Sequence, residues 1–592
     1  MNSLSQPADG IPSSEESLPF GDSSLNSSRT RWMTCGVLLL WGVLGARLLH
    51  IQWWQQVQFS HVAARQQINS EVLRARPGDI RDRRGRLLAT TIVVPSFYAD
   101  PHAISDPDEF SRQVANILSL DAEELSQRLE KYRNRRFLWI KRRLTEQEQQ
   151  ELVALKLPAN VCGLKSEFQR HYPQGTLAAH VLGLRDIDGH GRGGIEQTFD
   201  EILRGTDGTR RSVRDARGYT LEMLEEVTTP SSDGTEVTLT LDSVIQMRLE
   251  QRLDALMLQS KAQGICGIVL DPQRGEVLAM ASRPAFDPNH PEQASEAAWK
   301  NLCIAAVYEP GSTIKPLVVG RALDLHKIER FENLDCEHGA YRMGPRVLHD
   351  HHPYGVMSIT DVLVKSSNIG MAKIGERLGN EELYKLLLDC GFGEKTGIEL
   401  PGELPGMIRS LPQWNVYSTG SIPMGQELAV TPLQMLSAHA ALASGGRRIS
   451  PHLLMSTNEA QPTAHHILVS QVLSADNSRW LIAGPLVDVI ERGTGTKARI
   501  PGLSVFGKTG TAEKIDPRTG KYSETKQVSS FVCGAPAESP QVMVLITVDE
   551  PAGNEFGGTI AAPAAADVLR ESLQYLVPAK FATLDETNES SR

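Results

Sequence analysis

Three short polar motifs lie far apart in this chain, and the fold is most constrained by the need to bring them together. The first is Tyr-Glu-Pro-Gly-Ser-Thr-Ile-Lys at 308–315, the second is Ser-Ser-Asn at 366–368, and the third is Lys-Thr-Gly-Thr at 508–511. Together they supply a serine with a lysine one helical turn away, a second serine with an asparagine, and a lysine on a strand. Such a set can build an acyl-serine site without a histidine. The sequence therefore predicts acyl transfer.

The chain contains two S-x-x-K motifs, and their surroundings distinguish them. Ser312 opens a mostly apolar run, which predicts a buried helix that begins at the serine. At this spacing Ser312 and Lys315 share one face of the helix, so that the amine can reach the hydroxyl. Ser523 lies instead in the charged run 518–526, which is typical of a solvated hairpin tip. We therefore expect Ser312 to be the nucleophile.

The K-T-G motif also occurs twice. Lys508 follows strand-like residues at 503–506, whereas Lys395 lies among glycines and prolines without a β run, as in a loop. Between the first and third motifs, apolar residues at helical spacing from 359 to 369 predict a helix that ends against a cleft at Ser366. Lys508 and Ser366 are therefore the expected partners of the nucleophile.

Hydrophobic patterning divides the rest of the chain into two predicted domains. Residues 60–230 mix charged residues with short elements, which predicts an α+β pedestal with a strand at 92–98 and helices at 108–118 and 145–155. A turn-rich break precedes the second domain, 235–578. Its predicted elements are a strand at 237–241, a helix at 243–258, a hairpin of 265–271 and 276–282, strands at 503–508, 528–533 and 542–548, and a helix at 564–576. Helices between these strands predict an α/β sandwich.

An apolar segment near the N-terminus predicts a single membrane anchor. Residues 32–46 carry no charged side chain, and apolar residues continue to Trp54, so that a helix over 31–54 can span a bilayer. Arginines just before this segment favour a cytoplasmic N-terminus. The alternative is a cleaved signal peptide, but no Ala-x-Ala site follows the apolar run. Either way, we expect the remainder of the chain to be exported.

Composition narrows the remaining classes of protein. The net charge of −10 and a pI near 5.9 give no basic excess for binding nucleic acid. The seven cysteines are scattered and contain no C-x-x-C pair, so we expect no disulfide framework and no zinc site, although one or two bridges remain open. The His-Asp-His-His run at 349–352 is expected to be a polar loop beside the cleft. We expect no metal and no cofactor. Polar residues at 1–30 and 579–592 predict tails, the first of them disordered and cytoplasmic.

Further motifs give a resemblance to a known family. They are Arg-Pro-Gly-Asp-Ile-Arg-Asp-Arg at 76–83, Tyr-Ala-Asp-Pro at 98–101, Arg-His-Tyr-Pro at 170–173 and Gly-Gly-Ile-Glu at 193–196. With the three site motifs in order, the chain resembles a class B penicillin-binding protein, a monofunctional D,D-transpeptidase, over about residues 31–578. The resemblance implies a penicilloyl-serine transferase domain, with a five-stranded antiparallel sheet flanked by helices. It also implies an elongated pedestal of the dimerisation type.

The resemblance implies a substrate and a role for each site residue. Ser312 would attack the carbonyl between two D-alanines of a stem pentapeptide on the lipid-linked precursor polymer, and an amine of a neighbouring stem would then take the acyl group. Lys315 would be the base, made neutral by burial and by the charge of Lys508. Backbone N–H groups of Ser312 and Thr511 would hold the oxyanion. The other implied roles are proton relay for Ser366, amide binding for Asn368, and carboxylate binding for the strand residues Thr509, Gly510 and Thr511.

The resemblance further implies that β-lactams, which mimic the D-Ala-D-Ala end, acylate Ser312. The stretch 135–143 and the Tyr-Ala-Asp-Pro motif favour the cell-division type, located in the inner membrane with a periplasmic catalytic domain. Its implied partners are a membrane glycan polymerase and other division proteins. Three alternatives remain open: an elongation-type transpeptidase, a β-lactamase or penicillin sensor of the same fold, and a catalytically idle scaffold. The long N-terminal module and the anchor argue against a compact secreted β-lactamase.

Overall fold

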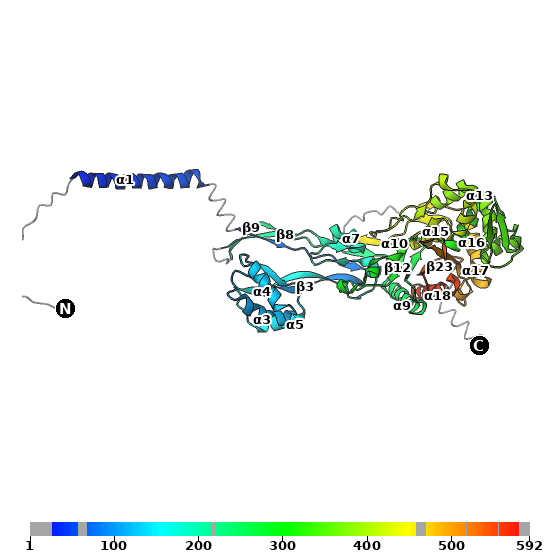
Figure 1. Ribbon diagram of the computed structural model, residues 1–592, viewed down its shortest axis with the longest axis horizontal. Coiled ribbons are helices and arrows are strands. Elements are labelled where there is room, and N and C mark those ends of the chain that lie inside the picture. The colour runs from blue at the N-terminus through cyan, green and yellow to red at the C-terminus, as the bar shows by residue number, and fades with distance from the viewer. Residues whose placement is uncertain are drawn as a thin grey trace, which may run out of the picture. The chain divides into compact units, whose positions relative to one another are not determined.

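The structure of this chain is a computed structural model that describes residues 27–56, 68–214, 220–457, 469–516, 518–553 and 556–578 (Figure 1). Contacts divide the chain into two units. Unit 1 is Met1–Leu73 with Gly208–Pro230, and unit 2 is Arg74–Asp207 with Ser231–Arg592. Nearly all of the two predicted polar tails lies outside the described residues.

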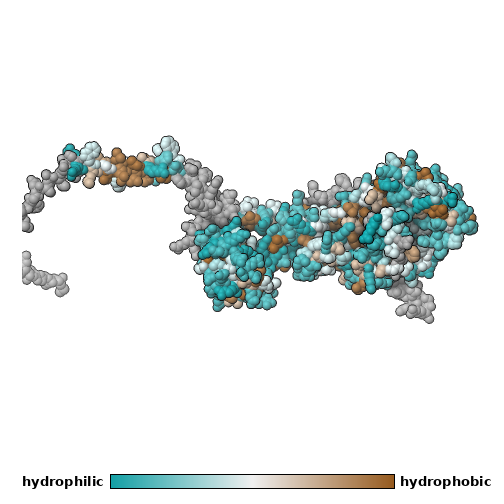
Figure 2. Space-filling model, viewed as in Figure 1, coloured by the Kyte–Doolittle hydropathy of each residue, from teal (hydrophilic) through white to brown (hydrophobic). Residues whose placement is uncertain are grey.

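Unit 1 contains the predicted anchor. Helix α1 (Ser27–Leu49) continues into a π-helical turn, η1 (His50–Trp54). The part from Arg31 to Trp54 is long and apolar enough to cross a membrane, it is not buried, and among the described residues it is the one helix with these properties. Figure 2 shows hydrophobic residues gathered along the middle of α1. This helix is consistent with a single-pass anchor. The same unit holds an antiparallel sheet of β1 (Ile68–Leu73), β8 (Gly208–Arg214) and β9 (Thr220–Thr229).

The N-terminal part of unit 2 is built on a long antiparallel pair of strands. Its elements are β2 (Ile80–Arg81), β3 (Leu87–Ala99), β4 (Leu138–Lys141), β5 (Cys162–His171), α3 (Pro107–Leu118), α4 (Ala122–Lys131) and α5 (Glu146–Ala154). The three helices bury apolar residues against Phe97 of β3 and Ile140 of β4. Asp106 caps α3 by accepting hydrogen bonds from two backbone N–H groups, and Thr145 caps α5 in a capping box with Glu148. The strand and helices predicted here are confirmed within a few residues, except that β3 is longer.

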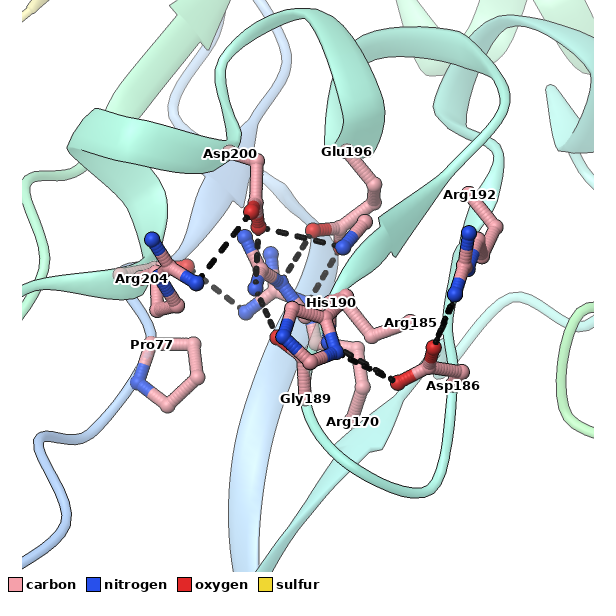
Figure 3. Close-up of polar contacts among 12 residues, drawn as sticks. Pro77, Arg170, Arg185, Asp186, Gly189, His190, Arg192, Glu196, Asp200 and Arg204 are labelled. Atoms are coloured by element: carbon pink, nitrogen blue, oxygen red, sulfur yellow. Dashed lines mark hydrogen bonds and ion pairs between the residues drawn. The ribbon is translucent and has the colours of Figure 1, made fainter.

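A charge cluster of the buried residues Arg170, Arg185 and Glu196 and the partly exposed Asp200 joins the end of β5 to the segment that follows it (Figure 3). Glu196, on the short helix α7 (Gly194–Thr198), accepts from Nε of Arg170 at 2.5 Å and from Nε of Arg185 at 2.6 Å. The carboxylate is fully buried and the two arginine side chains are 2% exposed. Asp200 lies 2.8 Å from Arg185. Arg170 also donates to the carbonyl oxygen of Gly78 at 2.7 Å, which ties this region to β2.

The C-terminal part of unit 2 contains a five-stranded antiparallel sheet, in the order β12-β11-β24-β23-β22. The strands are β11 (Gly264–Asp271), β12 (Glu276–Arg283), β22 (Phe506–Ile515), β23 (Tyr522–Ala535) and β24 (Val542–Asp549). Five of the six strands predicted for this domain form this sheet. Strand β22 begins three residues later than expected and continues through the K-T-G motif to Ile515, because its pairing with β23 rather than its own apolar pattern sets its length.

Helices cover both faces of this sheet. On one face, α9 (Ser243–Ser260) and α18 (Gly557–Leu576) bury residues such as Ile265 and Val544. On the other, α10 (Leu302–Ala305), α11 (Lys315–Asp324) and α15 (Pro432–Ala443) bury the alternate positions, such as Cys266 and Leu545. Helix α18 begins seven residues before its predicted start. The layered α+β architecture therefore agrees with the expectation.

Strand β10 (Val237–Leu239) has partners that its sequence does not reveal. It pairs in parallel with β2 and antiparallel with β20 (Leu454–Thr457), so it stays outside the five-stranded sheet. Alternating residues predict a half-buried strand but not its neighbour.

The structure also answers the question of disulfides, because all seven cysteines are free.

Candidate active site

The nucleophile motif forms a tight turn against β22. Ser312 lies in a 3₁₀ turn, η4 (Gly311–Ile314), and the α-helix α11 starts only at Lys315. Gly311 has a φ of +55°, and a Cβ there would lie 2.7 Å from the carbonyl oxygen of Thr511. Only glycine combines this conformation with so close an approach. The turn is thus held beside the strand that carries the third motif.

The two motif lysines converge on Ser366. Nζ of Lys315 donates to the carbonyl oxygen of Ser366 at 2.7 Å, to Oδ1 of Asn368 at 2.9 Å and to Oγ of Ser366 at 3.3 Å. Nζ of Lys508 donates to the same Oγ at 3.1 Å and to the carbonyl oxygen of Thr509 at 3.1 Å. Both lysines are completely buried. The structure therefore brings the three motifs together, with the Ser366 hydroxyl between two amines.

Burial dominates the electrostatics of the two lysines. It lowers the pKa of Lys315 to about 7, while the charge of Asp350 acts in the opposite direction. Burial, followed by repulsion from Lys315, lowers the pKa of Lys508 well below its usual range. Repulsion between two ammonium groups is mutual, so the pair disfavours a second positive charge in this site. An uncharged amine near neutral pH is therefore available at this site.

Ser366 has an unusual backbone conformation. It follows α12 (Ile359–Val364) and precedes α13 (Asn368–Asp389), and its φ is +60°. A non-glycine residue in the left-handed region is strained, and such strain is typical of functional sites. This turn aims the Ser366 hydroxyl and the Asn368 amide at Lys315. The helix predicted to end at Ser366 ends at Val364, two residues earlier, and the next helix begins at Asn368.

The contact expected between Lys315 and the nucleophile differs from the one observed. Lys315 donates to Ser366 and Asn368, and within the described part of the chain Ser312 Oγ has no hydrogen-bond partner. The α-helix expected to begin at the serine begins at Lys315, and the acceptors that the Lys315 amine contacts belong to the second motif. Ser312 remains partly exposed, so its hydroxyl is open to a substrate.

The remaining motif residues lie along β22. Oγ1 of Thr509 is 2.7 Å from Oγ1 of Thr494, and Oγ1 of Thr511 accepts from the N–H of Gly557 at 3.3 Å. A Cβ on Gly510 would lie 2.8 Å from Cγ2 of Thr313, so this glycine lets the nucleophile turn approach the strand. Thr494 was not identified from the sequence, because a Gly-Thr-Gly loop carries no catalytic pattern.

The duplicate motifs lie elsewhere. Lys395 is exposed in a loop, and Oγ of Ser523 accepts hydrogen bonds from backbone N–H groups at the base of the β22–β23 hairpin tip. The His-Asp-His-His run does line the site region, through Asp350, whose carboxylate accepts from Ser367 and Asn368. Sequence analysis treated this run as a polar loop and missed Asp350. Among the described residues, no group of histidine, cysteine and carboxylate side chains is arranged to hold a metal ion.

Comparison with known proteins agrees with this geometry. Two family models match, the penicillin-binding protein dimerisation domain at 73–239 and the penicillin-binding protein transpeptidase domain at 265–570. Stage V sporulation protein D of Bacillus subtilis is 33% identical over 509 residues, which are 84% of this chain and 78% of that protein. Peptidoglycan D,D-transpeptidase FtsI of Escherichia coli is 29% identical over 540 residues, 90% of this chain and 89% of FtsI.

A solved structure is similar over the same extent. The crystal structure of penicillin-binding protein 3 from Mycobacterium tuberculosis, complexed with aztreonam, has a TM-score of 0.67 and 28% identity, and the match covers 85% of this chain and 97% of that one. The two family models lie in the order of pedestal and catalytic domain, and the site motifs fall inside the second. The chain therefore belongs to the class B penicillin-binding proteins, the family of serine-type peptidoglycan D,D-transpeptidases.

Proposed function

We propose that Ser312 forms the acyl-enzyme and that Lys315, in its neutral form, accepts the serine proton. The observation that carries this proposal is the convergence of both buried lysines on Ser366 Oγ. One of these lysines, Lys315, follows Ser312 by three residues. The serine oxygen attacks the carbonyl between the two D-alanines of a stem pentapeptide, and the bond to the terminal D-alanine breaks. In the second step, an amine of a neighbouring stem attacks the ester and releases Ser312.

The polar groups around Lys315 have complementary roles in the proposal. Ser366 passes a proton to the leaving amine, and Lys508 holds the Ser366 hydroxyl in place. The N–H groups of Ser312 and Thr511 stabilise the oxyanion, and losing one such donor costs about 3–4 kcal/mol of transition-state stabilisation. Asn368 binds the peptide amide, while Thr509, Gly510 and Thr511 of β22 accommodate the terminal carboxylate.

Intact-mass measurement of the purified chain with a penicillin tests the nucleophile. We expect one stable adduct, on a peptide that contains Ser312, and no adduct in Ser312→Ala. Ser523→Ala is the matched control, because Ser523 belongs to the other S-x-x-K motif at the hairpin tip. Adduct formation by Ser312→Ala would refute the assignment. Rapid loss of the adduct in the wild type would favour the β-lactamase or sensor alternative.

We further propose a role in septal cell-wall synthesis. The layout would be a cytoplasmic tail, an anchor at 31–54, a pedestal at 60–230 and a periplasmic transpeptidase domain at 235–578. The partners would be a membrane glycan polymerase and other division proteins. The stretch 135–143 supports the division type, although one relative carries the name of a sporulation stage. A fluorescent fusion should collect at the division site; uniform lateral labelling would indicate an elongation enzyme.

A further inference from the structure

The carboxylate of Asp350 binds the start of the helix that carries the second motif. Asp350 directly follows β15 (Arg346–His349). Its Oδ1 accepts from the N–H of Asn368 at 2.5 Å and of Ile369 at 3.1 Å, and its Oδ2 accepts from the Ser367 hydroxyl at 2.6 Å. A helix N-terminus has unsatisfied N–H groups and a positive potential, both of which favour a carboxylate.

The turn formed by Ser366, Ser367 and Asn368 also supplies the hydrogen-bond acceptors of Lys315. Ser366 and Asn368, which flank Ser367, together supply all three acceptors that Nζ of Lys315 contacts. Ser367 is itself fixed, because its hydroxyl donates to Asp350 and accepts from the N–H of Gly370 at 3.0 Å. Asp350 and Lys315 thus bind different groups of the same turn.

We propose that Asp350 is a positioning residue for acylation, which holds the Ser366–Asn368 turn against Lys315 and directs a negative charge towards its amine. The proposal rests on the proposed role of Lys315 as the base. Burial alone favours the neutral amine, and the charge of Asp350 partly offsets that preference. Asp350 therefore keeps the buried amine basic enough to take the serine proton.

Other charged and titratable groups lie close to this turn. Lys508 faces Lys315 from β22, and it interacts with the same Ser366 hydroxyl. Lys373, on α13, pairs with Glu337 at 2.6 Å. The remaining titratable groups near Asp350 are Asp335, Cys336, Tyr354 and the flanking histidines His349, His351 and His352. Of the carboxylates named here, Asp350 is the one whose charge stabilises the protonated form of Lys315, whereas Lys508 and Lys315 disfavour each other's charge.

The substitution Asp350→Asn removes the charge of the side chain but keeps its size and shape. The amide oxygen can still accept from the helix N–H groups, but the negative charge is lost. We expect the acid limb of the pH profile of penicillin acylation to move to lower pH by about half a unit or more, since Lys315 then protonates less readily. We also expect the plateau rate to fall by about tenfold as the turn loosens.

Two further variants make the test specific. Asp350→Glu retains the charge and should return the acid limb towards its wild-type position, whatever its plateau rate. Glu337→Gln removes a carboxylate of the same neighbourhood that pairs with Lys373 and should leave the profile unchanged. Melting curves check that each variant folds.

The outcomes distinguish a failure of the proposed function from a failure of the proposed role of Asp350. If wild-type Ser312 is not acylated, the proposed function fails. If it is acylated and Asp350→Asn keeps the wild-type acid limb, or moves it to higher pH, the role of Asp350 is overturned. A lower plateau with an unchanged acid limb also overturns it, because that pattern indicates a purely structural contact.

Discussion

Replacing Glu196 with glutamine should destabilise the protein strongly. Glutamine keeps the size of the side chain and removes the negative charge that two buried arginines share, Arg170 at 2.5 Å and Arg185 at 2.6 Å. Asp200 then remains as the carboxylate of the cluster, and it contacts Arg185 at 2.8 Å. Arg170 would keep only neutral acceptors, including the carbonyl oxygen of Gly78.

The expected magnitude follows from the burial of the cluster. Removing one partner of a buried ion pair costs about 3–5 kcal/mol, because an uncompensated charge is left in a low-dielectric environment. For a domain of 150–250 residues, roughly 2–4 °C of melting temperature corresponds to each kcal/mol. The melting temperature of the Glu196→Gln variant should therefore fall by roughly 6–20 °C.

Thermal unfolding of the full chain in detergent, followed by circular dichroism, measures this effect. Glu130→Gln is the matched control, since Glu130 pairs with Arg133 at 3.0 Å but the two side chains are 57% and 54% exposed. An exposed pair contributes at most about 1 kcal/mol. Equal melting temperatures for the two variants would refute the argument that the cluster stabilises this region through its charges.

Two other predictions concern the site. Penicillin acylation by the wild type should slow below about pH 7, because the pKa of Lys315 is lowered to about 7 and only its unprotonated form accepts the serine proton; a rate that is constant down to about pH 5.5 would contradict this. Gly311→Ala should slow acylation at least about tenfold, because its Cβ would meet the Thr511 carbonyl oxygen at 2.7 Å. Gly397→Ala, at another positive φ but with no atom within 4 Å of the new Cβ, should leave the acylation rate unchanged, and equal slowing in both would refute the steric argument.

Local patterns predicted local structure well. The apolar run after Ser312 predicted a buried helix, and the strands at 265–271 and 542–548 carry strong apolar patterns in their own residues. The partner of β10 was not predictable, since alternation specifies a face but not a neighbour.

Long-range relations in the site escaped the sequence for a similar reason. Asp350 binds the N-terminus of a helix that begins eighteen residues later in the chain, and no local pattern predicts that contact. The end of a helix at this motif was predicted, but the left-handed conformation of Ser366 was not, because serine carries no preference that would reveal it. The order of the three motifs did predict the site, because the chemistry of an acyl-serine site requires all three motifs together.

The position of β22 at the edge of the five-stranded sheet has a further consequence. A strand with one open side offers a row of backbone hydrogen-bonding groups to any extended chain, a foreign strand or a second copy included. Such pairing is opposed by charged side chains near the hairpin end of β22, among them Lys514 and Lys526, which pair with Glu550. These charges therefore oppose unwanted pairing of β22 with another strand.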